Sequence, residues 1–185
     1  ARALYQHLGD EEGRSEDDYA MNRTDREFRN LLLVEQPNGD FAHTIVRQFL
    51  FDCYQLQLWA DLSASDDEVV SGIAGRAMKE AEYHHRFSHG WMMRMGDGTE
   101  ESHRRAQDAI DALSRFTDEM FEGEAVAYRE TWESLVTEML TGAGLSRPDD
   151  PYQKTGGRIG YHTEHLGYLL TEMQWMQRTY PGLEW

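Results

Sequence analysis

Residues 78–91, MKEAEYHHRFSHGW, place two glutamates, a tyrosine and three histidines in the middle of one expected helix. Four-helix bundles hold pairs of iron or manganese ions with carboxylates and imidazoles on facing helices, usually as Glu-x-x-His on two of them. Glu82-x-x-His85 has this spacing. The stretch therefore predicts a helical bundle, and the direction in which the motif faces decides between a metal site and a relative that has lost it.

Helices are expected on both sides of this stretch, because apolar residues recur at three- and four-residue steps and no segment alternates as a strand would. Within residues 41–60, for example, Ala42, Ile45, Phe49 and Cys53 follow this spacing. We expect helices over residues 1–8, 24–35 (with Thr24 as N-cap), 41–60, 66–95, 99–120, 125–139 and 161–180, with polar loops at 9–18 and 141–160. The predicted fold is an all-α, ferritin-like helical bundle, with residues 1–185 forming a single domain.

Composition narrows the classes of function. The chain has 185 residues, with 18 basic and 34 acidic side chains and a net charge of −16, which argues against nucleic acid or an anionic membrane as the main partner. A single cysteine, Cys53, and no apolar run of about 20 residues favour a soluble cytoplasmic protein. The opening run ARALYQHL reads as the tail of a helix, so we expect N-terminal helices to be missing from the sequence as given.

The facing direction of residues 78–91 follows from a helical wheel at about 100° per residue. The apolar stripe is centred close to His84, and Glu80 lies roughly 60° from that centre. Asp52 flanks the stripe of its own helix in a similar way. Glu82 lies about 140° away, on the outer face. The inward glutamate is then Glu80, and the residue three positions later is a tyrosine, Tyr83.

A phenol with an ordinary pKa near 10 is a poor replacement for a neutral imidazole on iron, so this half-site looks degenerate. Two interpretations remain open. Asp52, Glu80, Tyr83 and His84 form a buried polar network that is the vestige of a metal site, or they belong to a working metal site.

Two further groups follow near the C-terminus. His162 and His165 could ligate zinc at their i, i+3 spacing, but no further ligand has an obvious spacing, and packing or capping is the alternative. Lys154 and Arg158 flank two glycines, and such a loop could hold a phosphate, dock on a partner, or simply be solvated.

The sequence also resembles a known family. The runs REFRNLLLVEQPNGDFAHTIVRQF (26–49), KEAEYHHRFSHGW, RMGDGTEESHRR and TGGRIGYHTEHLGYLLTEMQWMQRTYPG are similar, in the same order, to the structural subunits of the bacterial ring 1,2-phenylacetyl-CoA epoxidases. This resemblance covers most of the chain. Family members carry two more helices before the position of Ala1 and a longer connector at residues 121–124.

The resemblance implies a ferritin-like, non-catalytic subunit that supports a homologous di-iron subunit in aerobic phenylacetate degradation. It implies a heterodimer, no cofactor in this chain, di-iron in the partner, and a reductase with flavin and iron–sulfur centres. Tyr83 in the place of a ligand histidine agrees with this role. Candidate partner contacts are His162, His165, Trp175 and Tyr180, because aromatic residues are enriched at interfaces.

Two alternatives stay open. The chain could itself be a catalytic di-iron oxygenase or oxidase. It could also be a helical module that binds the CoA ester through Lys154 and Arg158.

Overall fold

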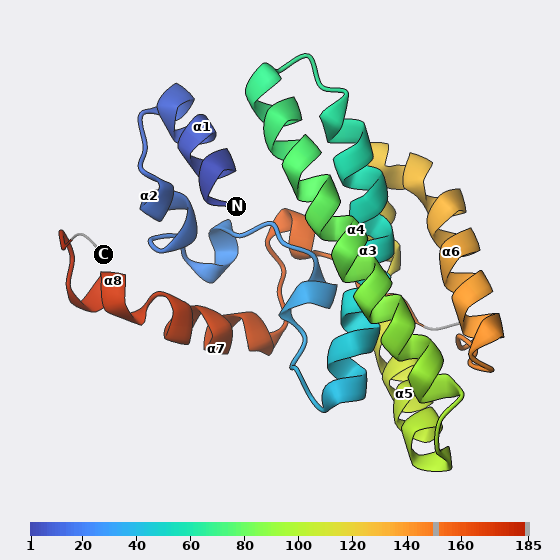
Figure 1. Cartoon of the computed structure of the whole chain (residues 1–185). Coiled ribbons are helices and arrows are strands. Elements are labelled where there is room, and N and C mark those ends of the chain that lie inside the picture. The colour runs from blue at the N-terminus through green and yellow to red at the C-terminus, as the bar shows by residue number, and fades with distance from the viewer. Residues whose placement is uncertain (150–151, 184–185) are drawn as a thin grey trace. The chain divides into compact units, whose positions relative to one another are not determined.

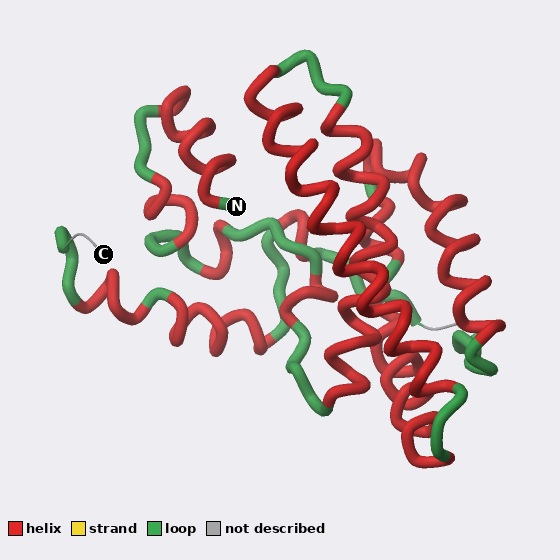
Figure 2. The backbone as a smooth tube through the Cα atoms, viewed as in Figure 1, coloured by secondary structure: helices red, strands yellow, loops and turns green. Residues whose placement is uncertain are grey.

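The computed structural model describes residues 1–149 and 152–183 and confirms the all-α fold class. Over these ranges the chain forms eight α-helices and six short 3-10 helices, joined by loops and turns, with no β-strand (Figure 2). The chain divides into two compact units, Pro37–Thr155 and a unit formed by Ala1–Gln36 with Gly156–Trp185. The single ferritin-like domain stays a prediction.

The larger unit, Pro37–Thr155, is organised around a helical hairpin of α3 (Phe41–Ser63) and α4 (Glu68–Gly96) (Figure 1). Each helix begins with an aspartate whose side chain accepts hydrogen bonds from the first turn. Asp40 accepts from the backbone N–H of His43, and Asp67 accepts from those of Val69 and Val70. These caps satisfy N–H groups that have no partner within the helix. They fix where both helices start and therefore the register of their contact.

The other helices of this unit pack on the hairpin. They are α5 (Glu100–Leu113), the 3-10 turns η3 (Ser114–Phe116), η4 (Asp118–Phe121) and η5 (Gly123–Tyr128), and α6 (Arg129–Gly142). Trp132 of α6 is fully buried, and its indole N–H donates to the carbonyl oxygen of Leu50 at 2.8 Å. The buried core of this unit also includes side chains from each of the four helices: Val46, Phe49, Met92, Ile110, Val136 and Met139.

The smaller unit brings together segments from both ends of the sequence. It contains α1 (Arg2–Glu12), α2 (Glu16–Ala20), η1 (Asp25–Glu27), η2 (Leu32–Glu35), η6 (Gly157–Ile159), α7 (Glu164–Met173) and α8 (Trp175–Thr179). The ring of Tyr5 stacks on that of Tyr19 at 5.6 Å between centroids. The Gln174 amide donates to the carbonyl oxygens of Ala20 and Arg23, which joins the two segments.

Three predicted helices are interrupted or shortened. The helix expected over 99–120 ends as α5 at Leu113, and the one over 125–139 becomes α-helical only at Arg129. The helix expected over 161–180 is divided into α7 and α8.

Two further predicted elements are wrong. Residues 9–18 are not a loop, because α1 continues to Glu12 and α2 starts behind a capping box between Ser15 and Asp18. Residues 24–35 are not one α-helix, although Thr24 does form a capping box with Glu27 at the start of η1. The chain is extended at Phe28 and Leu31 between η1 and η2, and Glu35 at the end of η2 contacts the distant residue Thr163.

The helices predicted at 41–60 and 66–95 are confirmed with small changes at their ends. Within the described residues, no helix combines the length and the apolar character that a membrane span requires.

Candidate functional site

A buried carboxylate lies between α3 and α4. Asp52 is completely buried. Its Oδ2 accepts a hydrogen bond from the hydroxyl of Ser88 on α4 at 2.7 Å, and its Oδ1 accepts from the amide of Gln48, one turn earlier on α3, at 2.5 Å. The carboxyl group is therefore satisfied by side chains from both helices, as a buried polar group must be. The prediction that Asp52 faces the interior is confirmed.

The surroundings of Asp52 shift its pKa in opposite directions. Burial raises the pKa of the Asp52 carboxyl above its usual value, while the hydrogen bonds from Ser88 and Gln48 and the nearby His84 imidazole lower it. Burial is the largest of these causes. The hydroxyl and the amide thus hold a carboxyl group that the apolar surroundings disfavour as an anion.

The other members of the predicted network do not join Asp52 in the interior. The side chains of Glu80, Tyr83 and His84 are exposed, with 59% of Tyr83 accessible. The expectation that His84 and Glu80 point inward is therefore wrong in this structure. Ser88, which the sequence reasoning passed over, takes their place as the residue of α4 that contacts the carboxylate.

The reason lies in which residues of α4 form the buried stripe. Ala74, Ala81, Ser88 and Met95 are buried at intervals of seven residues, with Met92 beside them. Ser88 lies inside this stripe on a helical wheel. Trp91, on the same side of the helix as His84, is only half-buried, so the stripe leaves His84 and Glu80 outside.

On the core side next to Ser88 lies His85, which is half-buried. Its ring stacks on that of Phe49 at 5.8 Å, and the ring of His89 lies 5.9 Å away. Burial, together with the nearby His89, lowers the pKa of His85. The stacked rings of Phe49 and His85 therefore form an aromatic contact between α3 and α4. The lowered pKa favours the neutral form of the His85 imidazole.

A di-iron centre between α3 and α4 would have to be held by these side chains. Such a centre needs several carboxylates and imidazoles that converge from facing helices. Both oxygens of Asp52 accept hydrogen bonds from side chains, and Glu80 is exposed. In residues 1–149 and 152–183, no three or more His, Cys, Asp and Glu side chains are grouped so that they could hold a metal ion. The described residues, as arranged, do not fit a di-iron centre.

A second buried carboxylate lies in the smaller unit and was missed in the sequence. Glu35 of η2 has 1% of its side chain exposed. Its Oε1 accepts from the backbone N–H of Thr163 at 2.8 Å, and its Oε2 lies 3.3 Å from Nδ1 of His162. The other ring nitrogen, Nε2, lies 3.1 Å from the carbonyl oxygen of Phe28 and must carry a proton to donate to it. Glu35 and His162 are an ion pair when the imidazole is protonated.

This contact changes the interpretation of two predicted residues. Thr163 is the N-cap of α7 but makes no side-chain cap, so Glu35 supplies the acceptor that the first turn requires. His162, predicted as a partner contact, has only 6% of its side chain exposed and is held inside the unit. That part of the prediction is wrong, because the imidazole is enclosed between η2 and the start of α7. His165 is half-exposed.

The remaining predicted residues lie apart. Lys154 belongs to the larger unit, where its backbone N–H donates to the carbonyl oxygen of Arg115 and its ammonium group lies 5.9 Å from the ring of Phe116. Arg158 belongs to the smaller unit. Trp175 and Tyr180 are exposed and meet edge to face at 6.2 Å between ring centroids. A phosphate or CoA contact at Lys154 and Arg158 stays a prediction.

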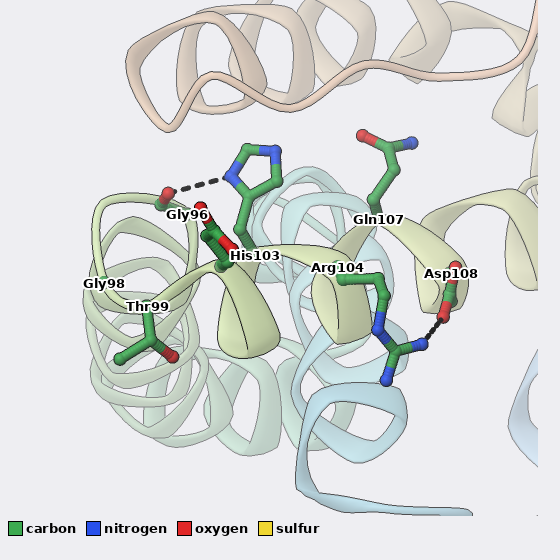
Figure 3. Close-up of a pocket in the computed structure, with 8 residues that line it drawn as sticks. Gly96, Gly98, Thr99, His103, Arg104, Gln107 and Asp108 are labelled. Atoms are coloured by element: carbon green, nitrogen blue, oxygen red, sulfur yellow. Dashed lines mark hydrogen bonds and ion pairs between the residues drawn. The ribbon is translucent and has the colours of Figure 1, made fainter.

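A shallow hollow of about 500 Å³ lies at the start of α5 (Figure 3). Nδ1 of His103 lies 2.9 Å from the carbonyl oxygen of Gly96, which fixes the proton on that nitrogen. Arg104 in the same hollow is bound by Asp108 and Glu101. The cation is therefore neutralised by its own helix, and the hollow has the character of a solvated surface.

Comparison with known proteins connects the chain with phenylacetate degradation. Residues 1–185 match the family model described as "Phenylacetic acid catabolic protein". The chain is also 43% identical, over 184 residues, to a protein of Escherichia coli (strain K12) that is named as one of the subunits of 1,2-phenylacetyl-CoA epoxidase. That alignment covers 92% of this chain and 74% of the relative.

Proposed function

The chain belongs to the phenylacetic acid catabolic protein family, and from this premise we propose that it is the structural, non-catalytic subunit of a phenylacetyl-CoA epoxidase. In this role it supports a homologous catalytic di-iron subunit, which inserts one oxygen atom into the aromatic ring of phenylacetyl-CoA with electrons from a reductase. The similarity to a relative that is named as a subunit of such an enzyme supports membership of the complex.

The observation that supports the non-catalytic role is that Asp52 belongs to no group of three or more metal-ligating side chains among the described residues. Its two oxygens accept hydrogen bonds from Ser88 and Gln48 in a fully buried position between the long helices. A carboxylate that serves as a metal ligand would present an oxygen lone pair to the ion. Each Asp52 oxygen keeps a second lone pair, but a di-iron centre needs several further carboxylates and imidazoles beside it, and the described residues bring none into such a group. The hydroxyl and the amide instead stabilise the hairpin. Tyr83, three residues after Glu80, stands where the Glu-x-x-His motif would have an imidazole, and its side chain is exposed.

Iron analysis tests the proposal. The chain is purified alone and in complex with its cognate catalytic subunit, and iron is measured in both. We expect about two irons per complex, contributed by the catalytic subunit, and substoichiometric iron in the chain alone. Oxygen-dependent epoxidation with the reductase is expected only from the complex.

A matched pair of variants makes the test sharper. Asp52→Asn in this chain should leave the iron content of the complex unchanged, whereas a carboxylate-to-amide change at an iron ligand of the catalytic subunit should lower it. If the chain alone binds about two irons and consumes oxygen with the reductase, it is a catalytic di-iron protein and the proposal is wrong.

A further inference from the structure

Helices α7 and α8 carry apolar side chains on two faces. One face is buried in the smaller unit through Leu166, Leu170 and Gln174. A second face is exposed and consists of Leu169 (45% exposed), Met173 (39%), Met176 (40%) and Tyr180 (48%), which we call the α7–α8 seam. When a helix has a single apolar face, that face packs against the rest of its own unit. A helix with a second apolar face has surface left for another binding partner.

The spacing of the seam matches a helix-binding surface. Its residues follow one another at intervals of four, three and four, which is the spacing of the a and d positions in a coiled coil. The helical hydrogen bonding continues through Gln174, whose N–H donates to the carbonyl oxygen of Leu170 and whose carbonyl accepts from Arg178. Leu169 and Met173 of α7 and Met176 of α8 therefore lie in one row, and Tyr180 follows directly after the end of α8. Such a row accepts the side chains of a facing helix.

The seam lies in a region that is unusually rich in exposed apolar side chains. Of the 16 large hydrophobic residues that are exposed in the described chain, eight lie between Tyr161 and Leu183. Tyr161, Tyr168 and Trp175 add aromatic surface beside the seam, with 72%, 71% and 54% exposed. Exposed apolar side chains gathered in one region mark a candidate site of protein interaction. Methionine and aromatic residues are also the types enriched at interfaces.

The seam is held in place before any partner binds. The start of α7 is capped by Glu35 through the N–H of Thr163, and Gln174 and Arg178 both donate to the carbonyl oxygen of Arg23. A preformed helix loses little conformational freedom on binding, which favours affinity.

Charge decides between a second copy and a different chain. Two copies would bring together chains that each carry a net charge of −16, which repel each other at long range. Glu172, which is exposed, lies on the helix surface next to Met173 and Met176. This carboxylate favours a facing helix with lysine or arginine next to its apolar stripe.

We propose that the α7–α8 seam docks an amphipathic helix of the catalytic subunit, whose apolar stripe is flanked by basic residues. This inference rests on the proposed function, since that function supplies the partner, and it assigns the contact to Leu169, Met173, Met176 and Tyr180. His162 serves only to hold the start of α7.

The test compares two variants of the full chain in binding to the purified catalytic subunit by titration calorimetry. Met173→Glu combined with Met176→Glu places two carboxylates in the seam, and we expect the dissociation constant to rise about 100-fold or more. Val126→Glu, at a 61% exposed apolar residue of the other unit, is the control and should change it by less than about threefold. Circular dichroism confirms that both variants keep the helical content of the parent.

A third variant tests the charge of the partner. Glu172→Lys should weaken binding in low salt, and the difference should diminish at high salt, as screened rim charges do. Sedimentation of the chain alone tests whether a second copy of the same chain binds the seam instead.

The outcomes separate the two proposals. If the parent binds the catalytic subunit and the double variant binds equally well, the seam is not the interface, although the proposed function stands. If the chain dimerises through the seam and the double variant abolishes the dimer, the occupant is a second copy and this inference is wrong. If the parent does not bind the catalytic subunit at all, the proposed function fails as well.

Discussion

Ser88→Ala removes the hydroxyl that donates to Asp52 across the α3–α4 hairpin. Both residues are completely buried, and the donor and acceptor oxygens are 2.7 Å apart. The variant leaves the carboxylate with Gln48 as its only side-chain donor among the contacts described above. A hydrogen bond to a charged group contributes about 1.5–3 kcal/mol to stability, and no water replaces it easily in a packed interior. A loss of ~2 kcal/mol lowers the melting temperature by about 4–8 °C.

The penalty should depend on pH in a defined direction. The pKa of Asp52 is raised in the folded state, so between its ordinary value of 3.8 and the folded value the native state binds more protons than the unfolded state. In this window stability falls as pH rises. Ser88→Ala removes a cause that lowers the pKa, which raises it further and extends the fall to higher pH. The difference between variant and parent should therefore be largest at pH 7 and smallest below pH 3.8.

Ser114→Ala is the matched control. Ser114 is also a buried serine of the larger unit, and its hydroxyl donates to the carbonyl oxygen of Ile110 at 2.7 Å. Because that acceptor is uncharged, we expect a loss of about 0.5–1.5 kcal/mol that does not vary with pH. Urea unfolding at pH 4 and pH 7 measures both variants. A Ser88→Ala variant within about 0.5 kcal/mol of the parent at pH 7, or a penalty that grows on acidification, would refute the reasoning.

Two further predictions concern the same unit. In Gly96→Ala the added Cβ would collide with the carbonyl oxygen of Ala143, so the free energy of unfolding should fall by about 1–3 kcal/mol. In Gly90→Ala, in the same helix, the added Cβ meets nothing within 4 Å, and the free energy of unfolding should rise by about 0.5–1 kcal/mol. Thermal unfolding measures both variants. An equal effect of the two changes would contradict this packing. The hydroxyl of Tyr128 donates to Asp61 at 2.6 Å, and burial, with that bond, raises the pKa of Tyr128 to about 12. Because the folded state keeps this proton to a higher pH than the unfolded state, stability should fall as pH rises from about 10 to 12. Urea midpoints measured over this range should fall less in Tyr128→Phe than in the parent. An identical fall in both proteins would speak against the hydrogen bond.

The sequence predicted the long helices well because local and tertiary signals agree there. Asp40 and Asp67 stand where caps are needed, and the apolar stripes behind them meet each other in the hairpin. It failed at Glu35, which looked like the last residue of a helix. Its structural role comes from Thr163, 128 residues away, and no local pattern carries that information.

For the candidate site, the residue types were easier to predict than their directions. Asp52 was identified as an inward carboxylate, but Ser88 was missed because a serine within a helix gives no hydrophobic signal. The heptad spacing of Ala74, Ala81, Ser88 and Met95 was visible in the sequence and would have placed Ser88 on the core side. The capping box at Ser15 and Asp18 was a similar unused signal for α2.

The construction of the smaller unit from both ends of the sequence sets an order of events during synthesis. The larger unit is one continuous segment, so its helices can pack before the later residues are made. Glu35 must wait for Thr163, and at 5–20 residues per second a separation of 128 residues corresponds to roughly 6–26 s. During this interval the acceptor that caps α7 is present while the helix itself does not yet exist. The apolar row on α7 and α8 therefore takes shape last, when a nascent chain has already folded its larger unit.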